Sequence, residues 1–342
     1  MDSNTDVADL KKQFIISLRK KFPRDSSSAI AIATVNLIRK IIFRENPKTM
    51  HELRVSLANH CRKLHAAERS EMIIINIGLM ISKLARDEIL QKKGGAEPEP
   101  LYTLWRDDAE VEEKLKTADM KKIRKDLQLS IKELSTEIES SRECVAAQST
   151  ELLFNNDFVM VHSRASSKTM NAFLAHATNA GRKHKIIDIV DEEEDLETAP
   201  DYVTPIQLYE VASKMPRTTK VVLVAACYFP DGSCLVPAGG HQIALLAKRH
   251  CVPLYVLAPF YKLSPFFITS PDTLHTFRRN TLPFNVASFG ANVDVLNPAF
   301  DTIQSDLITL FVTNNACLIP SHINRMKEDY YHAQDVDNFG DF

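Results

Sequence analysis

Two apolar runs, Val221 to Ala226 and Leu254 to Ala258, limit most strongly what this chain can fold into. The first is rich in β-branched residues, and both have the length of a buried strand. Between them, Gly239-Gly240 opens a segment whose apolar residues recur at helical spacing. Two apolar strands that a helix connects predict a parallel sheet covered on both faces. Because ligands of such sheets bind beyond the carboxyl ends of the strands, we expect a candidate site at residues 230–240.

The order of the elements divides the chain. Before residue 150, apolar residues recur at helical spacing, and one long segment carries an apolar stripe at Met120, Ile123, Leu127, Ile131, Leu134 and Ile138. Packing of this stripe against neighbouring helices, or a bridge to the next domain, is favoured over an independent coiled coil. From Phe158 onward, short apolar strands alternate with helical segments. We therefore predict the α/β fold class, with an N-terminal α-helical domain (1–150), a Rossmann-like parallel-sheet α/β domain (151–330) and a C-terminal tail (331–342).

Composition and charge narrow the class of partner. The 342 residues include 42 basic and 44 acidic side chains, and a net charge of -2 argues against binding to nucleic acid or to a membrane surface through bulk charge. The six cysteines form no CxxC pair, and the first ten residues are polar and acidic, unlike a signal peptide. The longest apolar run, Met72 to Ile81, is about half of the ~20 residues that a membrane span needs. We expect a cytoplasmic protein whose partners are proteins or small molecules.

Four segments carry a resemblance to a known family. They are VVLVAACYFPDGSCLVPAGGHQIALLAKRHCVPLYVLAPFYKLSP (221–265), ECVAAQSTELLFNND (143–157), SSKTMNAFLAHA (166–177) and FDTIQSDLITLFVTN (300–314). Over residues 7–330 the chain resembles the family that contains the regulatory alpha, beta and delta subunits of translation initiation factor 2B together with methylthioribose-1-phosphate and ribose-1,5-bisphosphate isomerases. APFYKLSP is most similar to the beta branch. Two departures stand out: a short acidic loop (191–201) replaces a strand-helix stretch usual in the family, and Gln304-Ser305 replaces prolines.

The resemblance implies a regulatory role without catalysis. Guanine-nucleotide exchange on initiation factor 2 would reside on the epsilon subunit, and a chain like this would help to bind factor 2 and to sense phosphorylation of the alpha subunit of factor 2 in the integrated stress response. The implied partners are the delta, alpha, gamma and epsilon subunits of initiation factor 2B, and factor 2 itself. The resemblance implies no cofactor, no membrane and no direct contact with nucleic acid.

The isomerases of this family use a cysteine after the first strand and an aspartate in a later turn to move a proton between sugar carbons. By resemblance, these positions are Ser163 and Ser233 here, and the Asn-Lys that helps to hold the phosphate is Val236-Pro237. A hydroxyl replaces neither catalytic group, so we expect no isomerase activity. Asp231 and Cys234 flank the lost aspartate, but their side chains would have to change register to take its place. A sugar-phosphate isomerase with a displaced site, or a degenerate sugar-phosphate-binding protein, remains the alternative.

We call the remnant of this site the vestigial pocket and assign it Ser163, Arg164, Ser166, Ser233, Gly239 and Gly240. The serines after the first strand could hold an anion at the helix N-terminus, but Ser166 or Ser167 acting as a helix cap is favoured. The histidines lack ligand spacing, and neither a metal motif nor a nucleotide motif is present, so we expect no metal and no cofactor.

Two surfaces are predicted to bind partners. The apolar residues Phe300, Ile303, Leu307, Leu310 and Phe311 recur at steps of three, four, three and one, and we expect them to form an exposed subunit interface towards delta. In the N-terminal helices, the polar faces carry a local excess of basic residues. From that excess we choose Lys20, Lys21, Arg62 and Lys63 as a partner-binding face for an acidic or phosphorylated protein.

Overall fold

The computed structural model describes residues 2–20, 26–68, 71–94, 120–190, 202–267 and 298–339. The chain divides into two compact units: the helical unit (Met1–Glu139 with Glu328–Phe342) and the α/β unit (Ser140–Lys327). The sequence places its boundaries at 150/151 and 330/331, whereas the units are divided at 139/140 and 327/328. The difference arises because the helices α7 (Met120–Ala147) and α13 (Ile323–Tyr330) both continue across a boundary, so no loop marks it.

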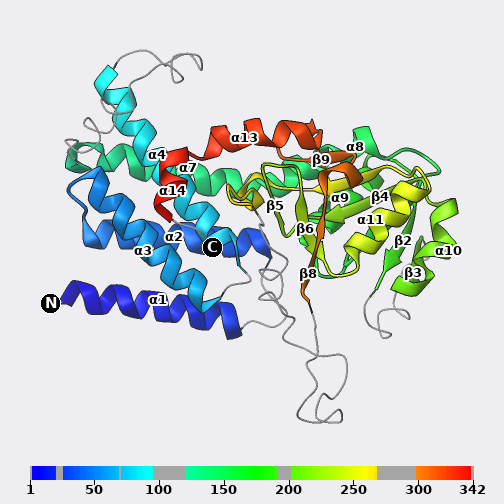
Figure 1. Cartoon of the computed structure of the whole chain (residues 1–342), viewed down its shortest axis with the longest axis horizontal. Coiled ribbons are helices and arrows are strands. Elements are labelled where there is room, and N and C mark those ends of the chain that lie inside the picture. The colour runs from blue at the N-terminus through cyan, green and yellow to red at the C-terminus, as the bar shows by residue number, and fades with distance from the viewer. Residues whose placement is uncertain are drawn as a thin grey trace, which may run out of the picture. The chain divides into compact units, whose positions relative to one another are not determined.

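Helices build the helical unit (Figure 1). They include α1 (Asp2–Lys20), α2 (Ser27–Glu45), α3 (Met50–Ala67), α4 (Ile73–Gly94), most of α7, and α14 (Ala333–Phe339). Phe14, Ile41, Leu64 and Ile74 come from α1 to α4 and pack into one buried cluster. The six stripe residues of α7 are each at most 6% exposed, which confirms that the stripe packs inside the unit.

The last residues of the chain belong to the helical unit, although the sequence predicts a separate tail. In α14, Asp335 is 2% exposed and its Oδ1 lies 2.8 Å from Nη2 of Arg86 and 2.9 Å from Nε of Arg54. Gln334 accepts hydrogen bonds from both arginines, through its side chain and its carbonyl oxygen. A charge that sequence inspection assigns to solvent is therefore buried between α3 and α4. Its partner Arg86 lies 249 residues earlier in the chain, where no local pattern points to it.

A seven-stranded sheet forms the centre of the α/β unit, in the order β10-β9-β7-β4-β1-β2-β3. Its strands are β1 (Phe158–His162), β2 (Lys185–Ile189), β3 (Val203–Ile206), β4 (Lys220–Val224), β7 (Leu254–Leu257), β9 (Leu310–Val312) and β10 (Cys317–Leu318). All neighbouring pairs are parallel except β9 with β10. A second, antiparallel sheet, which the sequence does not predict, joins β5 (Cys227–Tyr228), β6 (Cys234–Pro237) and β8 (Phe300–Ile303). The predicted fold class, helices followed by a mainly parallel sheet, is confirmed.

Both faces of the central strand β1 are buried. Val159 and Val161 pack in one buried cluster with residues of α9 (Lys168–Asn179), including Met170 and Phe173. Met160 points to the opposite face and is also fully buried. The near-continuous apolar sequence of the strand follows from this double burial. In the part of the chain that the structure describes, no helix is long and apolar enough to cross a membrane.

Candidate functional site at the rim of the sheet

The turn after β1 begins the predicted site. Ser163 has a positive φ of 54°, which is costly for a residue with a side chain. Its amide donates to the carbonyl oxygen of Ile189 at 3.3 Å, and its own carbonyl oxygen accepts from the hydroxyl of Ser166 at 3.0 Å. Strain of this kind gathers at functional sites. Here two hydrogen bonds, to Ile189 and from Ser166, hold the turn in this conformation.

Arg164, the cation of the vestigial pocket, is paired within the protein. Its Nε donates to Oδ2 of Asp188 on β2 at 2.7 Å. Burial raises the pKa of Asp188 above its usual value, although the charge and hydrogen bond of Arg164 act in the opposite direction. The second carboxylate oxygen of Asp188 has no hydrogen-bond partner among the described residues. The carboxylate and the guanidinium largely neutralise each other, so Arg164 offers a ligand little free charge.

A serine caps the helix that follows this turn. The hydroxyl oxygen of Ser167 accepts from the amide of Met170 at 3.2 Å, at the start of α9. The predicted cap is thereby confirmed for Ser167. Ser166 instead bonds back to Ser163 and leaves the cap to its neighbour.

The second predicted catalytic position lies in the turn between β5 and β6. Both the amide and the hydroxyl of Ser233 donate to Oδ1 of Asp231, at 2.9 and 2.7 Å. Gly232 has φ 78°, and a Cβ there would lie 2.7 Å from the Cβ of Pro320. The turn is thus closed on itself and tightly packed. None of the described hydrogen bonds of Ser163 or Ser233 links the two serines.

The two glycines at the start of α11 (Gly240–Arg249) have packing roles. Gly239 adopts φ 96°, and a Cβ on Gly240 would lie 2.2 Å from Cγ2 of Val236. The amides of Gly239 and His241 donate to Oδ2 of Asp301 at 2.8 and 3.3 Å. A helix N-terminus favours an anion, and here a carboxylate of the chain already occupies that position. Sequence inspection missed Asp301 because it lies about 60 residues further along, on β8.

The two side chains that flank Ser233 do not form a proton-transfer pair. Asp231 is engaged by Ser233, and burial raises the pKa of the Cys234 thiol, which keeps it protonated. The neighbouring Cys227 is buried as well. Among the residues that the structure describes, no group of three or more His, Cys, Asp or Glu side chains could hold a metal ion. The polar groups of the rim chiefly stabilise turns and helix ends.

The predicted exposed stripe after residue 300 is wrong as a continuous surface. The segment forms β8, a short 3₁₀ turn and β9 in place of one face of a helix. Ile303 and Phe311 are fully buried inside the chain and Leu307 is 9% exposed, while Phe300 and Leu310 are partly exposed. Steps of three and four predict one helical face, but strands with period two and a tight turn produce the same spacing by chance.

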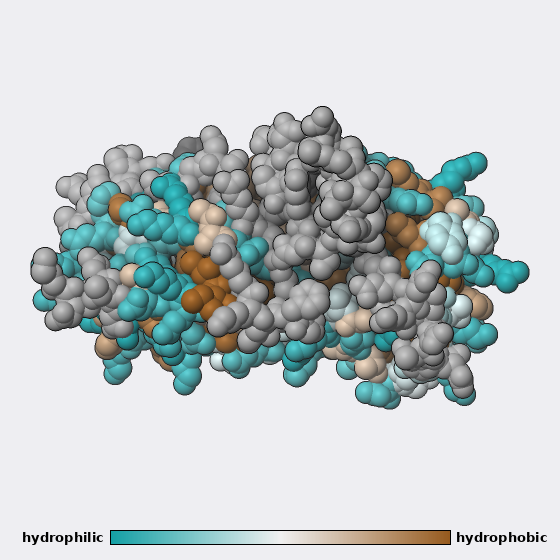
Figure 2. All heavy atoms as spheres, turned by 90° about the horizontal axis from the view of Figure 1, so that it is seen from below, coloured by the Kyte–Doolittle hydropathy of each residue, from teal (hydrophilic) through white to brown (hydrophobic). Residues whose placement is uncertain are grey.

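Other apolar side chains of the α/β unit reach solvent. The large ones that are at least 44% exposed are Phe154, Tyr202, Tyr209, Leu245, Phe267 and Ile319. On the face in Figure 2, hydrophilic residues cover most of the described surface, with smaller hydrophobic patches between them. Among the described residues, these side chains and not the buried part of the stripe are accessible to a partner of the α/β unit.

The predicted basic face is described only in part. Arg62 and Lys63 are exposed on α3, whereas the side chain of Lys20 and all of Lys21 lie outside the described residues. Burial lowers the pKa of Lys11 on α1, the positive charge of Lys63 lowers it further, and Glu45 opposes both effects. Nζ of Lys11 lies 3.0 Å from Nδ1 of His60 on α3, so the basic side chains of α1 and α3 lie close together on the helical unit.

Comparisons with known proteins define the class of protein to which this fold belongs. The chain belongs to the initiation factor 2 subunit family, whose model matches residues 24–194 and 202–320. A Dictyostelium discoideum protein named translation initiation factor eIF2B subunit beta is 31% identical over 218 residues, which are 60% of this chain and 55% of that protein. The chain thus matches about half the length of this relative.

Two further kinds of relative are informative. The methylthioribose-1-phosphate isomerase of Thermosipho melanesiensis is 30% identical over 123 residues, 34% of this chain and 35% of the isomerase. The crystal structure of eIF2B beta from Chaetomium thermophilum has a TM-score of 0.73 at 19% identity and covers 98% of this chain and 94% of its own. A chain of the tetrameric eIF2B-beta2-delta2 complex from the same organism has a TM-score of 0.70 at 19% identity, with 96% of both chains covered. At these identities the structures establish the fold.

Proposed function

We propose that this chain is a regulatory, non-catalytic subunit of the beta type in the complex that exchanges guanine nucleotide on initiation factor 2, and that it works in the cytosol. Family membership and the beta-named relative support this role. The observation that carries the proposal is the rim of the sheet. There, Ser163 and Ser233 take the positions that resemble the isomerase cysteine and aspartate, and each is bonded to its own neighbours.

The partners that we propose are the delta, alpha, gamma and epsilon subunits of the exchange factor and initiation factor 2. The Chaetomium tetramer supports the pairing with delta, because it is an eIF2B-beta2-delta2 complex. Exchange itself would belong to epsilon. The chain would contribute binding surface, and its response to phosphorylated factor 2 would slow initiation during the integrated stress response.

For the regulatory contact we propose the basic residues of the helical unit, Lys20, Lys21, Arg62 and Lys63. The exposure of Arg62 and Lys63 and the effect of Lys63 on Lys11 support this choice. A cluster of like charges attracts an acidic or phosphorylated surface over a distance of about one Debye length, roughly 8 Å at physiological salt. Its main effect is on the rate of association and on the salt dependence of binding.

The test uses the assembled exchange factor that contains this chain. Arg62→Glu with Lys63→Glu should leave assembly intact and weaken the inhibition that phosphorylated factor 2 exerts on nucleotide exchange. The matched control is Lys168→Glu with Lys183→Glu, which makes the same charge change at exposed positions of the α/β unit. Full inhibition of the first variant would remove these residues from the regulatory surface. Failure of the parent chain to co-purify with any other subunit would overturn the whole proposal.

A sugar-phosphate isomerase or binding protein is the second candidate, because part of the chain is similar to an isomerase. Incubation of the purified chain with methylthioribose 1-phosphate should give no ketose. Ser163→Cys with Ser233→Asp should also give little turnover, since Val236-Pro237 replaces the phosphate-holding Asn-Lys pair of the isomerases. Measurable isomerisation by the parent chain would favour the enzyme over the regulatory subunit.

A further inference from the structure

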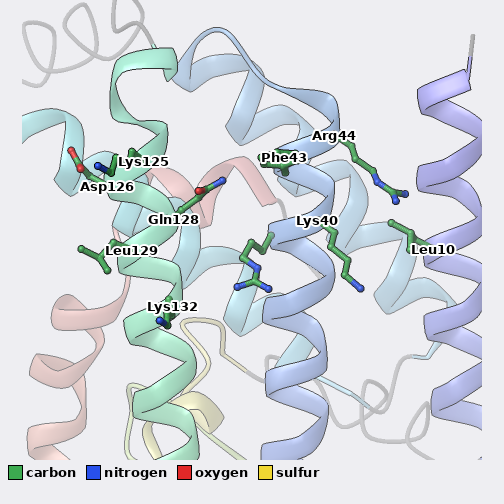
Figure 3. A pocket seen from close by; sticks show the side chains of 10 residues that line it. Leu10, Lys40, Phe43, Arg44, Lys125, Asp126, Gln128, Leu129 and Lys132 are labelled. Carbon is green, nitrogen blue, oxygen red and sulfur yellow. The ribbon is translucent and has the colours of Figure 1, made fainter.

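The helical unit contains a hollow of about 740 Å³ that the proposed regulatory face does not include. Its walls are α2 and α7, and α1 contributes Leu10 (Figure 3). Its lining includes Arg39, Lys40, Phe43, Lys125, Leu129 and Lys132. In Figure 3, Phe43 and Gln128 point into the gap between the two helices, and Lys40 points towards α1.

Helical spacing explains why these residues share a surface. On α2, Lys40 and Phe43 are three residues apart and therefore lie on one side of the helix. On α7, Lys125, Leu129 and Lys132 follow at steps of four and three, opposite the stripe that packs into the core. Each wall thus carries an apolar residue flanked by cations. The sequence of both helices contains this pattern of one apolar residue among cations. Sequence inspection missed it because it considered the apolar stripe of each helix and not the opposite, polar side.

The positive charges of the hollow are largely uncompensated. Arg39, Lys40, Lys125 and Lys132 are exposed, and none has an ion-pair partner within the described ranges. Asp126 is the one acidic side chain among the residues that line the hollow. Like charges on neighbouring turns destabilise a helix by a few tenths of a kcal/mol per pair, roughly 0.2–0.5 kcal/mol. A surface that keeps them unpaired is suited to an acidic ligand.

Two large apolar side chains stand among these cations. Phe43 is 59% exposed and Leu129 is 57% exposed. The guanidinium of Arg124 lies 4.5 Å from the centre of the Phe43 ring, and it donates to the carbonyl oxygen of Phe43 at 2.7 Å and to Oδ1 of Asn46 at 2.8 Å. These bonds link α7 to the end of α2 and hold one side of the ring. A rigid aromatic anchor loses little entropy when it binds a partner.

We propose that this hollow is a docking site for an acidic segment of a partner protein that carries large apolar side chains. The apolar side chains would contact Phe43 on one wall and Leu129 on the other, and the carboxylates would meet the cations around them, which combines apolar contacts with a polar surround. An amphipathic acidic helix satisfies both requirements at once. A second copy of this chain would bring the same cations against each other, so the charge argues against self-association.

The proposal goes beyond the regulatory role, because it concerns different residues and a ligand of stated chemistry.

The probes are three fluorescein-labelled helical 15-residue peptides tested on the full chain. One consists of Glu and Leu in an amphipathic pattern, the second has Ser in place of Leu, and the third has Lys in place of Glu. Fluorescence anisotropy at 50 and 300 mM salt should show binding of the Glu/Leu peptide alone. We expect its affinity to fall at least about tenfold at the higher salt, because exposed charges are screened.

Variants locate the binding. Lys40→Glu with Lys132→Glu should lower the affinity for the Glu/Leu peptide at least about tenfold. Phe43→Ser with Leu129→Ser should lower this affinity by a similar factor without changing its salt dependence. Lys168→Glu with Lys183→Glu in the α/β unit is the charge-matched control and should bind the peptide as the parent does. Circular dichroism should report unchanged helix content in all variants, as all six positions are exposed.

Three results would overturn the proposal: equal binding of the Lys-containing peptide, unchanged affinity of the Lys40/Lys132 variant, or tighter binding of a 15-nucleotide single-stranded RNA than of the Glu/Leu peptide. The last would indicate a nucleic-acid site. Because the probes contain no part of factor 2, a failed regulatory proposal leaves this outcome unaffected, and a failed docking proposal leaves the inhibition experiment unaffected.

Discussion

The rim of the α/β unit and the hollow of the helical unit use charge in opposite ways. At the rim, Arg164 is paired with Asp188, and the start of α11 holds the carboxylate of Asp301. In the hollow, Lys40 and Lys132 are exposed and have no ion-pair partner within the described ranges. The rim, where a fold of this type binds ligands, is therefore occupied by side chains of the chain itself. The hollow, where no ligand site is expected from the fold, carries unpaired cations. Fold alone points to the rim of the α/β unit, whereas the unpaired cations lie on the helical unit.

The helical unit also contains the reverse case, charges that are buried and fully engaged. Arg86 is 0% exposed and pairs with Asp335 of α14. The two sets of charges in one unit can be separated by experiment, because a buried pair supports folding and exposed cations support binding. Substitution of buried and exposed aspartates distinguishes the two roles, and the buried Asp335 should matter most for stability.

Asp335→Ala should be the most damaging single change. It leaves Arg86 buried without its carboxylate and removes the ion pair with Arg54. Removing one partner of a buried pair costs roughly 3–5 kcal/mol, because the remaining charge is uncompensated. Urea unfolding of the full chain, followed by circular dichroism, measures the loss.

Asp337→Ala is the matched control, since Asp337 is an exposed acid on the same helix. It should change the free energy of unfolding by less than about 0.5 kcal/mol. Equal costs for the two variants would mean that α14 does not hold the helical unit together. In that event the contrast between buried and exposed charge would fail.

Asp301→Ala should have an intermediate effect, in the α/β unit. The variant loses the acceptor for the amides of Gly239 and His241, and an unsatisfied helix start costs about 1 kcal/mol. Asp301→Asn keeps an acceptor oxygen and should cost less. If the rim serves only the fold, both variants should co-purify with partner subunits as the parent does. A lost partner without lost stability would show that the rim does contact another molecule.

Sequence reasoning succeeded where the signal is local. The strand β1, the cap at Ser167 and the α7 stripe depend on residues within a few positions of one another, and each lies as predicted. It failed at Ile303 and Phe311, where short strands and a turn mimic helical spacing. Asp301 and Asp335 could not be found in this way, because their partners are about 60 and 250 residues away in the chain.

The smallest predicted effect concerns pH and the histidines of the helical unit. Nδ1 of His60 on α3 lies 3.0 Å from Nζ of Lys11, and its Nε2 lies 2.7 Å from Oε1 of Glu45. Because an ammonium can only donate, Nδ1 is the acceptor and the proton sits on Nε2. Burial lowers the pKa of His60; Glu45 acts against this, and Lys11 and Lys63 add to it. Burial also lowers the pKa of His332, with Arg86 adding to the effect.

For both histidines, the folded pKa is below the unfolded value of about 6.5. Between these values the unfolded chain binds more protons, so stability is present above pH 6.5 and is lost as pH falls towards the folded pKa. His60→Gln keeps a neutral acceptor and donor and should reduce that loss of stability.

The measurement has to report on the helical unit alone. His184 of the α/β unit has a lowered pKa as well, so melting of the whole chain would combine the pH effects of both units. Hydrogen exchange of α1 and α3 at pH 7.5 and 5.5, corrected for the intrinsic rate, separates them: protection should fall at pH 5.5 in the parent and fall less in His60→Gln. Equal losses in both would show that the contact with Lys11 does not couple α1 to the charge of His60.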